Sequence, residues 1–420
     1  MSRFDTYFLL KEEDVIQYVR EKSHFFPPDA KLACKEIGDG NLNYVYRVED
    51  VETGRSLIAK QAGVTLRISK EMKLSTERNR KEAQILRLHA EVAPGLVPEV
   101  FAYDKTMCLS LMEDMRDFEL MRYALMQHKT FPNFADQITT FMVNTLLSTS
   151  DLVMDHQEKK ALVVEYMNPE LCEITEDLVL TEPVNDNKGR NKVFPPIRAF
   201  ADRELYQDNA LHLEVAKLKF TFLNKAESLI HGDLHTGSIF VNKEKTVVFD
   251  PEFAFYGPMG YDIGNVTANL MFAWCNGNTY KAEAFCAWVE KTIVEVVDMF
   301  TQKFKARFAE SKPDVMARTE GFLDWYAGEI LTDTAGYTGT ELLRRTVGMA
   351  QNKDVTSIDD EAARARIDRI NITAGKSFIM NREQIRTGRQ FLDTFLEAVS
   401  RQDEELRSNR EENPVKRQGV

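Results

Sequence analysis

The sequence is poor in cysteine and in long apolar runs. Its 420 residues include five cysteines, which are scattered, odd in number and without the spacing of a metal site. No apolar run approaches the roughly 18 residues that a membrane helix requires. The N-terminal segment turns charged too soon to hold the apolar stretch of a secretory signal. We therefore expect a reduced, cytoplasmic protein that does not enter a membrane.

Positive charge is also scarce. The 54 lysines and arginines are outnumbered by 66 aspartates and glutamates, so the formal net charge is −12 at neutral pH. Binding to nucleic acid or to an anionic membrane requires an electropositive surface, so we expect neither as a partner. Hydrophobic residues make up 43% of the chain, which is enough to bury large cores. The length predicts two or three domains, or one large unit of two lobes.

Periodicity separates a β-rich beginning from a helical remainder. Residues 42–48 mostly alternate between apolar and polar, and 56–60 form the expected returning strand. A helix is predicted over 76–89. The stripe formed by Leu213, Ala216, Phe220 and Leu223 predicts a later helix with this face against a core.

We therefore predict an α+β protein with two lobes. The predicted parts are a small N-terminal β-rich lobe over 1–112, a connector over 113–116, a larger, mostly helical C-terminal lobe over 117–407 and a flexible tail over 408–420. The tail is charged and has no apolar periodicity, which is typical of a frayed end. Ligands favour the cleft between two such lobes.

The first candidate for phosphate chemistry is the glycine-rich segment 38–43. Phosphoryl transfer needs backbone donors over the phosphates, a lysine, carboxylates for Mg²⁺ and a carboxylate facing the attacking hydroxyl. Glycine lets the backbone approach a phosphate, and Asn43 can donate to one. Taken alone, the segment is better explained as a hairpin turn. Lys60 lies in an otherwise apolar strand and could pair with Glu82, although both could equally face solvent.

The strongest pattern is the polar loop within His231–Phe240, which lies between two short apolar strands. Its central Asp233 would face a cleft, where a carboxylate can orient a hydroxyl and accept its proton. A hairpin in which this aspartate merely holds the turn is the less favoured alternative. We assign no chemical step to His231 or His235.

A second acidic pair follows the next apolar strand. Asp250 and Glu252 would lie on one face of an extended segment, and Pro251 between them restricts the backbone. Hard carboxylate oxygens suit a Mg²⁺ ion that nucleotide phosphates also bind. The pair is therefore a predicted magnesium site, with solvated turn carboxylates as the alternative.

These motifs resemble those of the protein-kinase-like phosphotransferases of small molecules, the aminoglycoside and choline kinase group, and more narrowly the methylthioribose kinase family. The resemblance rests on the segments 36–45, 231–240, 250–258 and 339–348. It implies a protein-kinase-like fold, ATP and Mg²⁺ as cofactors, and a homodimer. It also implies phosphorylation of 5-methylthioribose at its 1-hydroxyl in methionine salvage.

Carried over residue by residue, the resemblance implies two groups of nucleotide contacts. Asn43 and Lys60 would bind phosphates. The connector residues Glu113, Asp114 and Met115 would meet the adenine, mainly through backbone groups.

Metal and substrate contacts are implied in the same way. Relatives in the wider group have an asparagine where this chain has Ser238, and Glu252 would take over part of its metal coordination beside Asp250. Asp233 would be the base that faces the sugar hydroxyl. Arg344 and Arg345 would bind the sugar and offset charge on the moving phosphoryl group. Which arginine touches the sugar stays open.

Two rival functions are considered. A kinase of choline, homoserine or an aminoglycoside is disfavoured by Ser238, Glu252 and the paired arginines. A catalytically silent nucleotide-binding protein is disfavoured because Lys60, Asp233 and Asp250 are all present.

Overall fold

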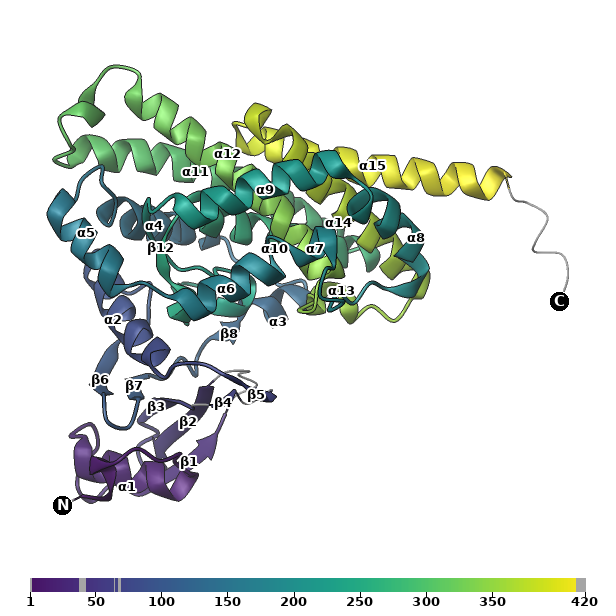
Figure 1. The fold of residues 1–420 in the computed structure, drawn as a ribbon. Coiled ribbons are helices and arrows are strands. Elements are labelled where there is room, and N and C mark those ends of the chain that lie inside the picture. The colour runs from purple at the N-terminus through teal and green to yellow at the C-terminus, as the bar shows by residue number, and fades with distance from the viewer. Residues whose placement is uncertain (1, 38–42, 64, 67–68, 413–420) are drawn as a thin grey trace, which may run out of the picture. The chain divides into compact units, whose positions relative to one another are not determined.

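The computed structural model describes residues 2–37, 43–63, 65–66 and 69–412 (Figure 1). The chain divides into two compact units. The first comprises Met1–Glu119 with Val247–Ala254, and the second comprises Leu120–Thr246 with Phe255–Val420. The smaller unit is rich in strands and the larger in helices, so the predicted α+β fold class is confirmed. The glycine-rich residues 38–42 lie outside the described residues.

The first unit is built on a five-stranded antiparallel sheet with the order β1-β2-β3-β7-β6. Its strands are β1 (Leu32–Glu36), β2 (Asn43–Asp50), β3 (Ser56–Ala62), β6 (Val100–Asp104) and β7 (Leu109–Glu113), and β4 (Thr65–Leu66) pairs separately with β5 (Ser69–Lys73). Helix α1 (Glu12–Lys22) packs on β1 and β2, whereas α2 (Glu77–Val92) packs on β3, β6 and β7. Apolar residues of α1 and of the sheet form one buried core.

The second unit is mainly helical. Its helices are α3 (Met121–Met126), α4 (Phe134–Ser148), α5 (His156–Glu165), α6 (Pro169–Leu178), α7 (Glu182–Asn185), α8 (Arg198–Ala201), α9 (Asn209–Asn224), α10 (Gly260–Thr279), α11 (Glu283–Glu310), α12 (Phe322–Val347), α13 (Lys353–Thr356), α14 (Glu361–Asn381) and α15 (Gly388–Glu412). The short strands β9 (Ser228–Ile230) and β12 (Phe255–Gly257) pair antiparallel. The remaining short strands are β8 (Glu119–Leu120), β10 (Ile239–Val241) and β11 (Thr246–Val248).

Glycines let α10 approach α12 closely. A Cβ on Gly260 would lie 2.5 Å from the backbone nitrogen of Thr334, and one on Gly264 would lie 2.7 Å from that of Thr338. Such distances exclude a side chain at either position. The close contact fixes α12, the helix that carries the paired arginines, against α10.

The predicted bounds of the larger lobe differ from the bounds of the observed second unit. The first unit continues to Glu119 and takes in Val247–Ala254, because the Val248 N–H donates to the Leu96 carbonyl (2.8 Å) and the turn Pro251–Phe253 packs on α2. Such contacts join segments that are distant in sequence, so no local pattern predicts them. Helix α15 continues past residue 408 to Glu412.

Helix α9 is present, but its predicted buried face is wrong. Leu213, Phe220 and Leu223 are 57%, 63% and 43% exposed, whereas Leu218 and Phe222 are buried. The helix carries apolar residues on more than one side, so periodicity alone does not select the face. Packing of α12 and α14 against α9 selects it instead.

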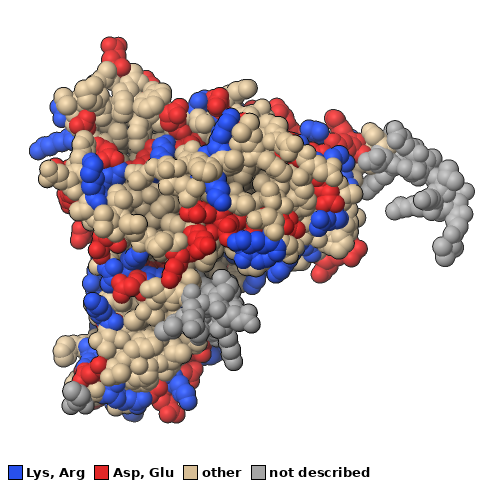
Figure 2. Space-filling model, in the orientation of Figure 1, with Lys and Arg blue, Asp and Glu red and all other residues tan. Residues whose placement is uncertain are grey.

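Surface charge is mixed. In the view of Figure 2, acidic and basic side chains are interspersed over the second unit. Within the described part of the chain, every helix is too short or too polar to cross a bilayer.

Candidate active site

In the first unit, a buried lysine joins two carboxylates. The Lys60 ammonium on β3 donates to Glu82 Oε1 on α2 (2.7 Å) and to Asp250 Oδ1 (2.5 Å). Burial by itself would lower the pKa of Lys60, but the charges of Asp250 and Glu82 outweigh it and raise that pKa. Burial raises the pKa of Glu82 to about 7, against the opposing effect of Lys60. The chain therefore holds Lys60 as a fully charged donor inside the unit.

The acidic pair lies in a tight turn after β11. Asp250 has a left-handed backbone (φ 66°) and a partly exposed carboxylate, and Pro251 begins the short helical turn that follows. Glu252 is buried and accepts a hydrogen bond from Asn43 Nδ2 (3.0 Å). Burial, together with the charge of Asp250, raises the pKa of Glu252 to about 8.

This donor set fits a divalent cation that also binds phosphate. The carboxylates of Glu82, Asp250 and Glu252 outnumber the cations of Lys60 and Arg78 around them, so an added cation would be stabilised. Among the described residues, no three His, Cys, Asp or Glu side chains are grouped to hold a metal alone. Mg²⁺ commonly binds one or two carboxylates and completes its shell with phosphate oxygens and water.

The carboxylates of Glu113 and Asp114, two of the three predicted adenine contacts, already have partners. The Asp114 carboxylate accepts two hydrogen bonds from the Arg47 guanidinium (2.7 and 2.9 Å) and one from Ser56 Oγ (2.7 Å). The Glu113 carboxylate accepts from the backbone N–H that precedes β6 (3.1 Å), and the Met115 carbonyl closes a turn. The adenine contact at this connector, which the resemblance implies, stays a prediction.

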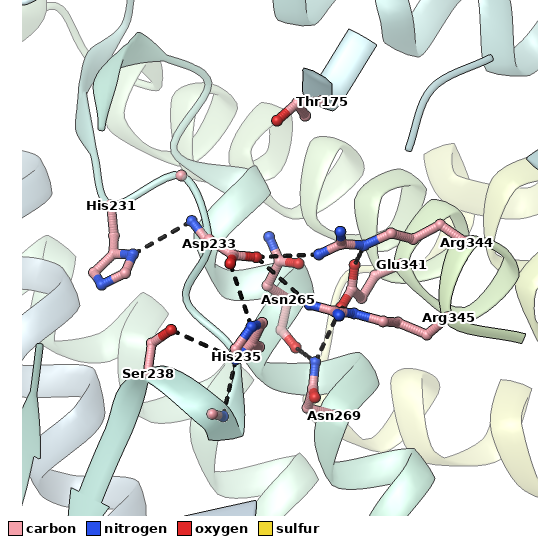
Figure 3. Close-up of polar contacts among 12 residues, drawn as sticks. Thr175, His231, Asp233, His235, Ser238, Asn265, Asn269, Glu341, Arg344 and Arg345 are labelled. Atoms are coloured by element: carbon pink, nitrogen blue, oxygen red, sulfur yellow. Dashed lines mark hydrogen bonds and ion pairs between the residues drawn. The ribbon is translucent and has the colours of Figure 1, made fainter. Parts of the chain in front are cut away.

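In the second unit, Asp233 is held between a histidine and two arginines (Figure 3). Its Oδ1 accepts from Arg344 Nη2 (3.1 Å) and lies 3.6 Å from Arg345 Nη2, while its Oδ2 lies 3.3 Å from His235 Nε2. Burial alone would raise the pKa of Asp233, but His235 and the two arginines lower it well below its usual range. Asp233 is therefore ionised and oriented.

A buried glutamate holds both arginines, and sequence reasoning missed it. Glu341 accepts from Arg345 Nε (3.0 Å) and, through its other oxygen, from Arg344 Nε. Asn269 Nδ2 also donates to Glu341 (3.2 Å). Residues three and four positions apart lie on one helix face, so a glutamate at 341 can reach both neighbours. The spacing of Glu341 from the two arginines is visible in the sequence and could have identified this contact.

Asp262 holds the backbone of the loop that carries Asp233, and sequence reasoning also missed it. From the first turn of α10 its carboxylate accepts from the N–H groups of His231 (2.7 Å) and Gly232 (3.0 Å). Gly232 has a left-handed backbone (φ 80°), which favours glycine. The contact spans some thirty positions, so no local pattern predicted it.

Replacing Asp262 with alanine is expected to destabilise the protein and to displace the loop. Each buried N–H left without an acceptor costs about 1–3 kcal/mol. The free energy of unfolding from urea denaturation should fall accordingly, and kcat should fall with it. Asp262→Asn keeps one acceptor oxygen and should lose less of both the free energy of unfolding and kcat. Equal stability of Asp262→Ala and the unaltered protein would show that Asp262 does not hold the loop.

Eight of the sequence-predicted residues thus form two groups. Asn43, Lys60, Asp250, Pro251 and Glu252 come together in the first unit, and Asp233, Arg344 and Arg345 come together in the second.

Known proteins resemble this chain along most of its length. Residues 33–288 match the phosphotransferase enzyme family. The chain is 38% identical over 375 residues to a methylthioribose kinase from Geobacillus sp. (strain WCH70), which covers 89% of this chain and 92% of that protein. It is 37% identical over 385 residues to a methylthioribose kinase from Yersinia pseudotuberculosis, with 90% and 93% covered. Among solved structures, an ethanolamine kinase from Plasmodium vivax aligns with a TM-score of 0.45 and 14% identity, covering 85% of each chain.

Proposed function

Since the chain belongs to the phosphotransferase enzyme family and, within it, to the methylthioribose kinases, we propose that it phosphorylates 5-methylthioribose at the 1-hydroxyl. ATP is the phosphoryl donor, and the products are 5-methylthioribose 1-phosphate and ADP. The reaction serves methionine salvage.

The observation that carries this proposal is the ionised Asp233 beside two guanidinium groups. Asp233 would orient the 1-hydroxyl and accept its proton as the oxygen bonds to the γ-phosphorus and the bond to ADP breaks. A carboxylate with so low a pKa is a weak base. The proton would therefore move late, once the bond to phosphorus has drawn electron density from the hydroxyl oxygen and made its proton more acidic. Arg344 and Arg345 would offset charge on the moving phosphoryl group.

The first unit would hold the nucleotide. Lys60 and Asn43 would bind its phosphates, and the backbone at Glu113, Asp114 and Met115 its adenine. Asp250 and Glu252, with Pro251 between them, would hold Mg²⁺, which would neutralise phosphate charge when bound.

Charge around Asp233 favours a neutral acceptor. Arg344 and Arg345 lie at its carboxylate, and Arg122 contacts His235 beside it. The carboxylates of Asp233 and Glu341 already bind Arg344 and Arg345, so they offer little attraction to a cationic acceptor such as choline or an aminoglycoside. A sugar without charge needs no free carboxylate.

A substrate panel tests the proposed function. Purified protein with ATP and Mg²⁺ is expected to release ADP with methylthioribose and to show a kcat/KM at least about 10²-fold lower with choline, homoserine or an aminoglycoside. Chelation of divalent cations should abolish turnover, and added Mg²⁺ should restore it. Preference for a cationic acceptor would overturn the substrate, and absence of turnover with every acceptor would support a catalytically silent protein.

Two further expectations remain predictions. Sedimentation velocity would test the homodimer, and fractionation of host cells would test the cytoplasmic location.

A further inference from the structure

The two ring nitrogens of His235 have different partners. Nδ1 lies 2.9 Å from the Gly237 backbone nitrogen and 3.2 Å from Arg122 Nη2 on α3. A backbone N–H and a guanidinium can only donate, so Nδ1 must accept. The proton of a neutral imidazole therefore lies on Nε2.

That proton faces Asp233. His235 Nε2 lies 3.3 Å from Asp233 Oδ2, whereas the arginines contact Oδ1 (Figure 3). The carboxylate is thus held at both oxygens, by charged donors on one and by the imidazole on the other. A carboxylate held at two points cannot rotate away from a bound hydroxyl.

We propose that His235 is a positioning residue for Asp233: a neutral imidazole, set in one tautomer by Arg122 and Gly237, whose Nε2–H orients the carboxylate toward the acceptor hydroxyl. The inference rests on the proposed function, because it needs Asp233 to face an acceptor. It brings in Arg122, which no sequence pattern singled out.

The glycine at position 237 supports the proposed tautomer of His235. A Cβ on Gly237 would lie 2.6 Å from His235 Cε1, 2.9 Å from Nδ1 and 3.0 Å from Arg122 Cζ. The ring and the guanidinium therefore fit together only against a bare backbone. Any larger residue would move the two groups that define the tautomer.

Charges around the ring keep it neutral. Burial, with Arg122 on α3 and Arg345 on α12, lowers the pKa of His235 to about 4, against the opposing charge of Asp233 in its own loop. Asp354 on α13 faces Arg122 and Arg345, and burial raises its pKa to about 6. A neutral donor orients Asp233 without adding a third full positive charge, which would weaken it further as a base.

Two amide replacements separate the functions of the ring nitrogens. In His235→Asn the amide can replace Nδ1 as acceptor but cannot reach Asp233, whereas in His235→Gln the longer amide can replace the Nε2–H donor. We expect His235→Asn to lose about 10²-fold in kcat with KM for ATP unchanged, and His235→Gln to keep most of the turnover. His156→Asn, at an exposed histidine, is the control. Equal turnover in both His235 variants, whether low or high, would overturn the proposal.

Removing Arg122 gives an independent test through pH. In Arg122→Met the ring loses a donor to Nδ1 and a neighbouring positive charge, so the pKa of His235 should rise toward its ordinary value. kcat should then fall as the pH drops from about 7 to about 5, because the protonated ring weakens Asp233 as a base. Arg122→Met combined with His235→Gln should lose this fall. A fall that persists in the double variant, or is absent from the single one, would count against the proposal.

The tautomer can also be observed without any variant that must stay active. Nitrogen-15 NMR of the histidine-labelled protein should show His235 protonated at Nε2 and bare at Nδ1 down to about pH 5, with the signal assigned by its loss in His235→Asn. A charged ring at neutral pH, or a proton on Nδ1, would refute the proposal. Turnover of methylthioribose by the unaltered protein tests the proposed function separately, so the two can fail independently.

Discussion

Replacing Asp233 with asparagine is expected to lower kcat by about 10³-fold while leaving the dissociation constant for ATP nearly unchanged. Asparagine keeps the shape of the side chain but cannot accept the hydroxyl proton. The groups proposed to bind nucleotide lie in the other unit, so ATP binding should survive. ADP release under saturating substrates measures the first effect, and titration calorimetry the second.

In the unaltered protein, Asp233 should stay ionised over a wide range of pH. Because His235 and the arginines hold the pKa of Asp233 well below its usual range, its carboxylate stays ionised through the neutral range. Its stabilising interactions are present above the ordinary aspartate pKa and are lost only as the pH falls through the lowered one. Asp393→Asn, at a partly exposed aspartate of the same unit, is a suitable control for kcat. Turnover retained in Asp233→Asn would mean that the hydroxyl is activated in another way.

Replacing Lys60 with methionine should damage both stability and turnover. The substitution leaves the buried Glu82 and the partly buried Asp250 without their shared cation, and breaking a buried ion pair costs about 3–5 kcal/mol. Loss of a charged donor at the phosphates should lower kcat/KM by at least about 10²-fold. Urea denaturation measures the first effect and ADP release the second.

A double variant separates the two effects of Lys60. Lys60→Met combined with Glu82→Gln removes the uncompensated buried charge, so much of the lost free energy of unfolding should return. Turnover should stay low, because the glutamine does not replace the phosphate donor. Recovery of turnover together with stability would show that Lys60 acts only by holding the fold.

Several details of the site were within reach of the sequence. Lys60, Glu82 and Asp250 meet in the structure, and each lies in a short contiguous pattern of strand, helix or turn. Asp233 lies in a loop between two short apolar strands, as its flanking residues predicted. Local patterns suffice to place each residue in its element, because burial of alternate residues and turn chemistry act over a few positions. The contact of Lys60 with Asp250 spans 190 positions, so only the fold supplies it.

Other details could not be read from local patterns. Helix α9 has apolar side chains on two sides, so the buried side around Leu218 depends on what packs against it. No local pattern marks Arg122, because its partner His235 lies in a different segment of the chain. A single arginine in a short helix carries no sign of such a partner.

The sequence by itself determined which chemical groups this protein brings to phosphoryl transfer, since those groups lie in contiguous motifs and mark the family. Only the tertiary structure decided how they are held. Asp262 secures the loop, and Arg122 sets the tautomer of His235. The physical reason is that a buried polar group must find a partner, and folding supplies that partner from wherever in the chain the packing brings it.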